Sequence, residues 1–413
     1  MPRFFLVLLV LLALFNSRRP LREARPGPDR PMDFRTCYVG QHVLRQGQNP
    51  YDDATLKQGW QQLVAQEQLL SRSQPGLPNL PFLYPPWAAA LFGLSIGQLP
   101  YSLAWPLWYA LALLSLGLLV WCWHLLLSKE AGNTPWWQFL VAALALKGTV
   151  PALLTGQPAF AALALGTGAL LAATRWPARP WAPWLAGVLL GLAAYKVTLL
   201  LPFVCWFLWR KEWKPLVVAA LVVAGLSAVA FAWADAPADM LPSYQQLLAQ
   251  VRAQSFDPAD PDYPLTQGLT LRLELGNVLE WLRPGSSAWH PLLHGLLWLG
   301  TLLRLGWLRR QGYHLATWYV FLLTGALTLL TTYHLYYDAL LLLPLLAFAR
   351  RQALSAQLLL LVLLLPLLLP LNGLAQALGN PPILHFVYFL MPLSLLGVLL
   401  LLLARPVQAG RSE

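Results

Sequence analysis

The sequence predicts an all-α polytopic membrane protein, a bundle of about twelve transmembrane helices. Of its 413 residues, 58% are hydrophobic and only 11% are charged, and the mean hydropathy is +0.54. Soluble domains carry about a quarter charged residues, so this composition belongs to a polytopic membrane protein. Only helices and closed barrels satisfy the backbone in lipid, and the long runs of Leu and Ala, which do not alternate with polar residues, favour helices.

The basic balance of the chain does not indicate a nucleic-acid partner. The net charge is +11, but the Lys and Arg residues fall in short loops between apolar runs, which is the positive-inside pattern of membrane proteins. The three cysteines, Cys37, Cys122 and Cys205, are far apart and have neither disulfide nor metal-ligand spacing.

The first apolar run covers Phe4–Phe15, roughly 18 Å of helix against a hydrocarbon core of about 30 Å. Arg3 ahead of this run also fits a signal peptide. No Ala-x-Ala-like site precedes Asn16-Ser17, so we favour a retained, short first helix. Under either interpretation, the loop that follows lies outside.

Further apolar runs follow Tyr101, and each has the length of a span or a half-span. The run 199–209 is short enough to be a half-helix, and 79–100 contains the tandem Pro85-Pro86, which predicts a helix start in the interface or a re-entrant segment. The expected spans are 102–127, 136–154, 158–174, 181–195, 199–209, 215–233, 289–306, 314–331, 335–349, 354–371 and 383–404.

The charges orient this topology. With the N-terminus inside, the short outside connections hold only Lys147 and Lys196, so both termini are expected to be cytoplasmic. Two long loops, 17–80 and 234–288, then face outward from a single domain covering 1–413. The inside loops hold Lys129, Arg175, Arg179, Arg210, Lys211, Lys214, Arg304, Arg309, Arg310, Arg350, Arg351, Arg405 and Arg411.

Polar groups in or beside a bilayer are costly, so each is a functional candidate. Asp33 begins the helix-like stretch "DFRTCYVGQHVLRQG" and is either an N-cap or a general base at the membrane surface. Gln157, in "LLTGQPAF", is either a polar cap or a substrate ligand. Lys196 lies near the outer face, where it either snorkels or holds a phosphate as a point charge.

A late motif, "TLLTTYHLYYDALLLLP", adds a second group of candidates. His334 and Asp338 are four residues apart and are expected to share one helix face, with Tyr337 beside them. The pair either holds helices together or binds a charged or hydroxylated ligand, with His334 titrating near neutrality.

The second long loop carries Asp257, Asp260 and Asp262. We interpret this Pro-rich acidic run as solvated rather than as a divalent-cation site. Gln267 is expected in a turn that returns the loop to the site. The topology sends Asp33, Tyr84, Gln157, Lys196 and His334 to the same outer leaflet, where the first loop is expected to cap a cavity.

An ordered series of motifs, over about residues 30–350, resembles the family 87 glycosyltransferases. Each motif alone is weak, but their order is specific. The series is Asp33-Phe34 with Tyr38, Asn49-Pro50-Tyr51-Asp52, Tyr84-Pro85-Pro86, Gly156-Gln157, Gly191-Leu192 with Lys196, and Thr331-Thr332-Tyr333-His334.

The resemblance implies a GT-C fold and an inverting transfer of a hexose, chiefly mannose. The implied donor is a polyprenyl-phosphate sugar and the acceptor a lipid or glycan, at the outer face of the cell inner or plasma membrane, without a cofactor or a required divalent metal. Asp33 is the expected catalytic base. The donor phosphate is assigned to Lys196, His334 and Arg35, and the substrate to Tyr38, Tyr84, Gln157, Gln267, Tyr337 and Asp338.

A transporter or a flippase for lipid-linked sugars is the alternative, because many spans and intramembrane polar groups also fit that class. Transporters tend to place charged sites near the midplane, in broken helices of two repeats. Here the polar residues collect at one face and no repeat is evident, which favours the enzyme.

Overall fold

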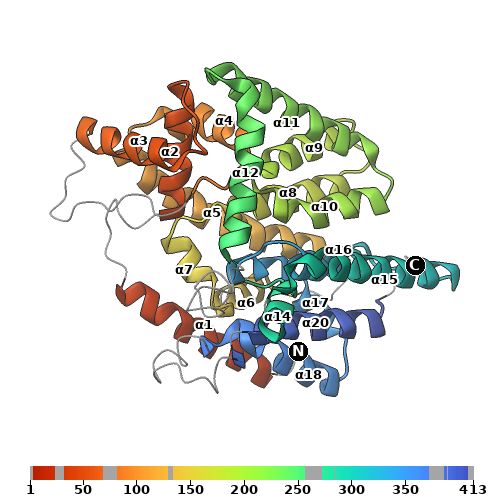
Figure 1. The fold of residues 1–413 in the computed structure, drawn as a ribbon. Helices are drawn as coiled ribbons and strands as arrows, with labels where there is room; N and C mark the ends of the chain where they lie inside the picture. Colours follow the sequence, from red (N-terminus) through yellow and green to blue (C-terminus); the bar gives the residue numbers. More distant parts are fainter. Residues whose placement is uncertain are drawn as a thin grey trace.

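The chain folds as an array of helices, seen in a computed structural model (Figure 1). The structure describes residues 3–23, 32–67, 81–128, 134–255, 272–283, 285–371, 386–387 and 389–407. Within those ranges the extended pairing is confined to an isolated antiparallel bridge between Arg272 and Leu335. The predicted all-α class is therefore confirmed.

The α-helices of the first half are α1 (Arg3–Glu23), α2 (Met32–Arg45), α3 (Asp53–Gln66), α4 (Pro86–Leu94), α5 (Tyr101–Leu127), α6 (Trp136–Ala145), α7 (Thr149–Leu154), α8 (Ala159–Arg175), α9 (Ala182–Ala193) and α10 (Val197–Trp209). Those of the second half are α11 (Trp213–Trp233), α12 (Pro237–Ser255), α14 (Gly276–Leu282), α15 (His290–Arg310), α16 (Thr317–Thr331), α17 (Leu345–Arg350), α18 (Leu354–Leu368) and α20 (Leu390–Ala404). Short 3₁₀ helices are η1 (Ile96–Gln98), η2 (Ala194–Lys196), η3 (Ser286–Trp289) and η4 (Tyr336–Leu342).

Many of these helices have the character of membrane segments. In the described part of the chain, three helical stretches are long and apolar enough to cross a bilayer: Tyr101–Leu127, Ala182–Trp209 and Trp213–Trp233. Several shorter apolar helices accompany them, including α8, α16, α18 and α20. The membrane character is therefore confirmed, whereas the count of twelve spans stays a prediction.

The stretch Ala182–Trp209 is not one straight helix, because the chain folds back at Lys196. There ψ is 76°, which breaks the helix between α9 and α10. The Lys214 ammonium lies 4.4 Å from the centre of the Trp184 ring. A straight helix would hold Trp184 and Trp209 about 37 Å apart, farther than the five residues from Trp209 to Lys214 can reach. The separate run 199–209 is thus a returning helix, α10.

Basic side chains at the ends of several helices gather on one face, as the loop charges predicted. Arg309 of α15 lies 5.7 Å from the ring of Trp209 at the end of α10. Arg350 donates a 2.6 Å hydrogen bond to the Thr134 hydroxyl, just before α6. We call this face of the bundle the basic face; the turn at Lys196 lies at the opposite end of α9 and α10.

The elements of the first predicted outer loop and of the predicted interfacial segment 79–100 cover that opposite end. The indole of Trp87 in α4 donates a 3.0 Å hydrogen bond to the carbonyl of Ala194, two residues before Lys196. Helix α2 packs on α4, and α3 packs on α2. Helix α12 runs at a steep angle to α8, α9 and α10 in Figure 1. The predicted spans 136–154 and 335–349 are interrupted: Leu146–Gly148 separates α6 from α7, and η4 precedes α17.

Candidate active site

Asp33 stands in the first turn of α2, where the backbone ties it to another segment. Its N–H donates a 3.0 Å hydrogen bond to the carbonyl of Thr155, at the end of α7. Its half-buried carboxylate accepts hydrogen bonds from the side chains of Thr155 and Gln157. Asp33 is therefore not only a helix cap, because its partners lie more than 100 residues away.

The surroundings of Asp33 change its acidity. Burial raises the pKa of its carboxyl above the ordinary value of 3.8, and the negative charge of Asp338 acts in the same direction. Hydrogen bonds from Thr155 and Gln157 and the positive charge of Lys196 oppose that rise. A carboxylate with a raised pKa is a better proton acceptor, which is what a general base requires.

Lys196, Asp338 and His334 form a buried chain of charged and titratable groups. The Lys196 ammonium lies 2.7 Å from Oδ1 of Asp338, and the second oxygen, Oδ2, lies 3.0 Å from Nδ1 of His334. Asp338 is 2% exposed and His334 is fully buried. Lys196 comes from the turn between α9 and α10, and Asp338 comes from η4, so the pair joins the two halves of the chain.

The sequence predicted that His334 and Asp338 share one face of a helix. This prediction of the local backbone is wrong. His334 precedes η4, and the residue after it, Leu335, is extended, with φ −95° and ψ 160°. The two side chains still meet, because the chain enters the 3₁₀ turn at an angle that brings Nδ1 to the carboxylate.

Tyr337 connects this group to Asp33. Its hydroxyl accepts a 2.7 Å hydrogen bond from Nε2 of Gln157, and its ring centre lies 4.8 Å from the Lys196 ammonium. Because Gln157 also donates to Asp33, one amide contacts both the proposed base and η4. Tyr84 lies beside the Cys37 thiol, within electrostatic range of Asp33 and Tyr337.

The remaining predicted residues are placed elsewhere or are outside the described chain. Arg35, two positions after Asp33, points to a different side of α2, and its guanidinium lies 5.1 Å from the centre of the Trp60 ring. The Tyr38 hydroxyl donates a 2.6 Å hydrogen bond to the carbonyl of Leu99. Gln267 and the acidic residues Asp257, Asp260 and Asp262 lie outside the described residues.

Two residues that sequence reasoning missed also belong to this neighbourhood. Thr155 contacts Asp33 through both its carbonyl and its hydroxyl. The only feature of the sequence that could have identified it is its position two residues before Gln157. Arg272 is 3% exposed, with its guanidinium 4.6 Å from the centre of the Tyr333 ring. The backbone N–H of the next residue, Leu273, donates a 2.9 Å hydrogen bond to the carbonyl of His334. No spacing within the sequence could predict this contact between distant segments.

The cluster thus offers a proton acceptor, an ammonium group and a histidine at the end of the bundle opposite the basic face. Among the described residues, no group of three or more His, Cys, Asp or Glu side chains is arranged to hold a metal ion. A base next to polar and cationic groups suits transfer of a group to a hydroxyl acceptor.

Comparison with known proteins identifies the family to which the chain belongs. The family model described as glycosyltransferase family 87 matches residues 82–332, more than half of the chain. The chain belongs to glycosyltransferase family 87. This membership supports glycosyltransferase activity in a membrane protein. The matched segment of this family 87 member contains Tyr84, Gln157 and Lys196, whereas Asp33 precedes it and His334 follows it. No curated protein and no solved structure matches the chain.

Proposed function

We propose that this family 87 glycosyltransferase is an inverting enzyme of the GT-C type that transfers a hexose, mannose first among the candidates, from a polyprenyl phosphate. The acceptor is a lipid or glycan at the outer membrane face. The observation that carries the proposal is the position of Asp33, whose carboxylate lies beside Gln157 and within electrostatic range of the Lys196–Asp338 pair.

In this mechanism the acceptor hydroxyl attacks the anomeric carbon while Asp33 takes its proton. The new bond joins the acceptor oxygen to the anomeric carbon, and the bond from that carbon to the phosphate oxygen breaks. The electron pair of the broken bond leaves with polyprenyl phosphate. A single displacement needs one base and no enzyme nucleophile, so the configuration inverts.

The leaving group is already a phosphate, so it needs charge stabilisation more than protonation. Lys196 and His334 supply positive or hydrogen-bonding groups on the Asp33 side of the site, and Asp338 orients both. Arg35 would have to leave the Trp60 ring to reach a phosphate, so we assign it a secondary part. Tyr84, Tyr337 and Gln157 are proposed to line the sugar position, with Tyr38 and Gln267 as further substrate contacts.

A lipid-borne donor also agrees with the proposed topology. Nucleotide sugars are confined to the cytoplasm, while the basic face, by the positive-inside rule, is cytoplasmic and lies opposite the cluster. Both termini are then cytoplasmic, and the transfer requires no nucleotide-binding domain.

The direct test uses purified protein in lipid nanodiscs with radiolabelled polyprenyl-phosphate mannose and membrane lipids, with and without chelator. We expect a mannosylated product, identified by mass spectrometry, together with free polyprenyl phosphate in equal amount. Movement of the lipid-linked sugar across the membrane without release of polyprenyl phosphate would instead show a transporter. Turnover of a nucleotide sugar but not of the lipid-linked sugar would overturn the assigned donor.

A further inference from the structure

Lys147 is a buried lysine that the mechanism above leaves unused. It lies between α6 and α7 and is one of the two lysines that the sequence places on short outer connections. Only 9% of its surface is exposed, and within the described residues its ammonium has no hydrogen-bond partner. Its own N–H donates a 3.1 Å hydrogen bond to the carbonyl of Leu367, at the end of α18.

A buried ammonium group without a counter-charge is costly, and in a bilayer such residues are usually functional. The charge of Lys196 is compensated within the protein, because the Asp338 carboxylate lies 2.7 Å away. For Lys147 an anionic ligand would provide the missing charge.

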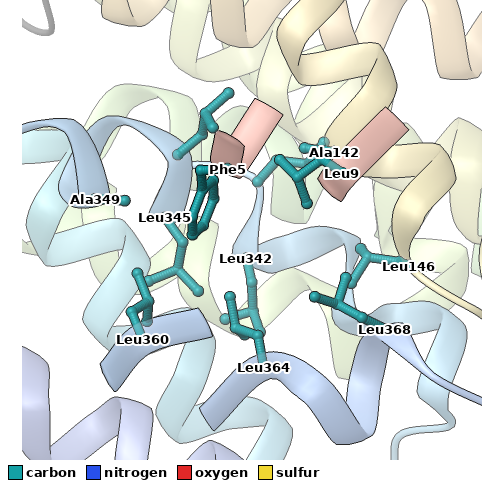
Figure 2. Close-up of a pocket in the computed structure, with 12 residues that line it drawn as sticks. Phe5, Leu9, Ala142, Leu146, Leu342, Leu345, Ala349, Leu360, Leu364 and Leu368 are labelled. Atoms are coloured by element: carbon teal, nitrogen blue, oxygen red, sulfur yellow. The ribbon is translucent and has the colours of Figure 1, made fainter. Parts of the chain in front are cut away.

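An apolar groove lies next to the backbone of Lys147, because the preceding residue, Leu146, is one of its lining residues. It lies between α1, α6, η4, α17 and α18, is open on one side, and is lined only by Leu, Ala and Phe side chains (Figure 2). Six of these side chains are Phe5, Leu9, Leu146, Leu342, Leu364 and Leu368. This lining fits a hydrocarbon tail and offers nothing to a polar molecule.

The end of the groove near Lys147 is fixed by hydrogen bonds. Leu146, the residue before Lys147, lines the groove, and so does Leu368, the residue after the Leu367 carbonyl that Lys147 contacts. The side-chain amide of Asn16 donates to the carbonyls of Ala145 and Leu368, at 2.6 and 2.7 Å. The backbone of the buried Lys147 therefore lies where α1, α6 and α18 are joined.

The other side of Lys147 leads to the catalytic cluster. Gly148 packs so closely on Tyr337 that an added Cβ would lie 2.7 Å from the Cα of Tyr337. Helix α7 then runs from Gly148 to Thr155, which contacts Asp33, over about 10 Å. Lys147 and Asp33 are thus at opposite ends of α7.

This separation suits an inverting transfer. The attacking oxygen and the leaving phosphate lie in line on opposite faces of the sugar, so the cation for the phosphate belongs across the sugar from the base. Lys196 is close to Asp33, and its charge is already balanced by Asp338. With Asp33 ionised, Asp33 and Asp338 face the single ammonium of Lys196, and the nearby Arg272 already lies 3.9 Å from the Glu274 carboxylate. This balance would repel a phosphate unless another cation takes part.

We propose that Lys147 binds the phosphate of the prenyl-phosphate donor and that the groove holds the first part of its prenyl chain. This inference rests on the proposed function, and it adds the residue and the surface that recognise the lipid. Lys147 then takes the main phosphate contact that the mechanism above gave to Lys196 and His334, and those two residues act on the side of the sugar that faces Asp33.

The test measures binding of polyprenyl phosphate without a sugar to the full chain in detergent, by native mass spectrometry. Lys147→Met should weaken that binding at least about tenfold, while binding of the uncharged prenol of the same chain length stays within about twofold. Lys147→Arg should restore most of the difference. Leu364→Trp, which fills the groove, should weaken both ligands, and the exposed, lipid-facing control Leu303→Trp should weaken neither.

Unchanged binding of polyprenyl phosphate to Lys147→Met would overturn the proposal, since Lys147→Arg and Leu364→Trp show whether the fold tolerates change there. Loss of bound phosphatidylglycerol instead of polyprenyl phosphate would also overturn it, because the groove would then hold a bilayer phospholipid. The proposed function fails separately: wild-type protein would bind polyprenyl phosphate through Lys147 and yet transfer no sugar from it.

Discussion

The Lys196 ammonium and the Asp338 carboxylate form a buried ion pair, 2.7 Å apart, across 142 residues of sequence. Removal of one partner from such a pair leaves the other charge buried and costs about 3–5 kcal/mol. We predict that Lys196→Met lowers the free energy of unfolding in mixed micelles by this amount and also lowers the transfer rate.

Two further variants control this measurement. Addition of Asp338→Asn to Lys196→Met should recover most of the lost stability, because no unbalanced charge remains. Lys57→Met removes the ammonium of an exposed pair with Asp53 and should change stability by less than about 1 kcal/mol. Equal effects of Lys196→Met and Lys57→Met would show that the buried pair does not hold the two halves of the chain together.

Asp33→Asn should abolish sugar transfer, by about 100-fold or more, because the amide cannot take the acceptor proton. Donor binding should remain, since the amide of the variant would keep contacts with Thr155 and Gln157. The matched control is Asp53→Asn, an exposed carboxylate on α3 of the same outer region, which should leave the rate near the wild-type value. Near-normal turnover by Asp33→Asn would remove Asp33 from the role of base.

The pH dependence of transfer follows from the raised pKa of Asp33. The base acts only when ionised, so the rate should fall as pH decreases, with a midpoint above the ordinary carboxyl value of 3.8. The profile of kcat/KM against pH measures this midpoint. A midpoint at or below 3.8 would contradict the assignment of the base.

The same shift has a consequence for stability. The folded chain binds the Asp33 proton more tightly than the unfolded chain, so ionisation of Asp33 weakens the fold as pH rises through the raised pKa. Asp33→Asn removes that contribution. Above this pKa the variant should therefore be at least as stable as the wild type, which thermal unfolding at several pH values measures.

Gly148 tests the packing between α7 and the cluster. An added Cβ would lie 2.7 Å from the Cα of Tyr337, so Gly148→Ala should displace η4, lower stability by about 1–3 kcal/mol and reduce transfer. Gly295→Ala on α15 is the matched control, because nothing lies within 4 Å of its added methyl group. That control should keep full activity and gain up to about 1 kcal/mol from helix propensity. Full activity in Gly148→Ala would show that η4 is not held in place by this contact.

Hydropathy and charge predicted the elements that one segment determines by itself. The run 102–127 became α5, the stretch after Asp33 became α2, and the basic side chains gathered on one face. The break near Lys196 also agrees with the expectation that 181–195 and 199–209 are separate segments, the second short enough to be a half-helix. These features depend on the residue composition of one short segment, so they can be predicted from a single sequence.

The contacts between distant segments could not be predicted in the same way. Arg35 packs on the ring of Trp60, and the Tyr38 hydroxyl donates a hydrogen bond to the carbonyl of Leu99. In both cases the partners are too far apart in the sequence to produce a local pattern. His334 illustrates the limit: its proximity to Asp338 was expected from an α-helix, whereas a 3₁₀ turn after an extended residue produces it. Spacing predicted the pair but not the backbone that forms it.

The fold-back at Lys196 has a consequence for the surrounding bilayer. Helix α9 has 12 residues and continues into the three residues of η2, and α10 has 13, so the two arms rise only about 20–24 Å, against a hydrocarbon thickness of about 30 Å. If the basic face lies at one headgroup layer, their shared tip stops several ångströms short of the other, and acyl chains beside it must shorten or tilt to match. The chemistry would then take place in a dimple sunk into the outer leaflet, and bilayers of thicker lipids should slow it.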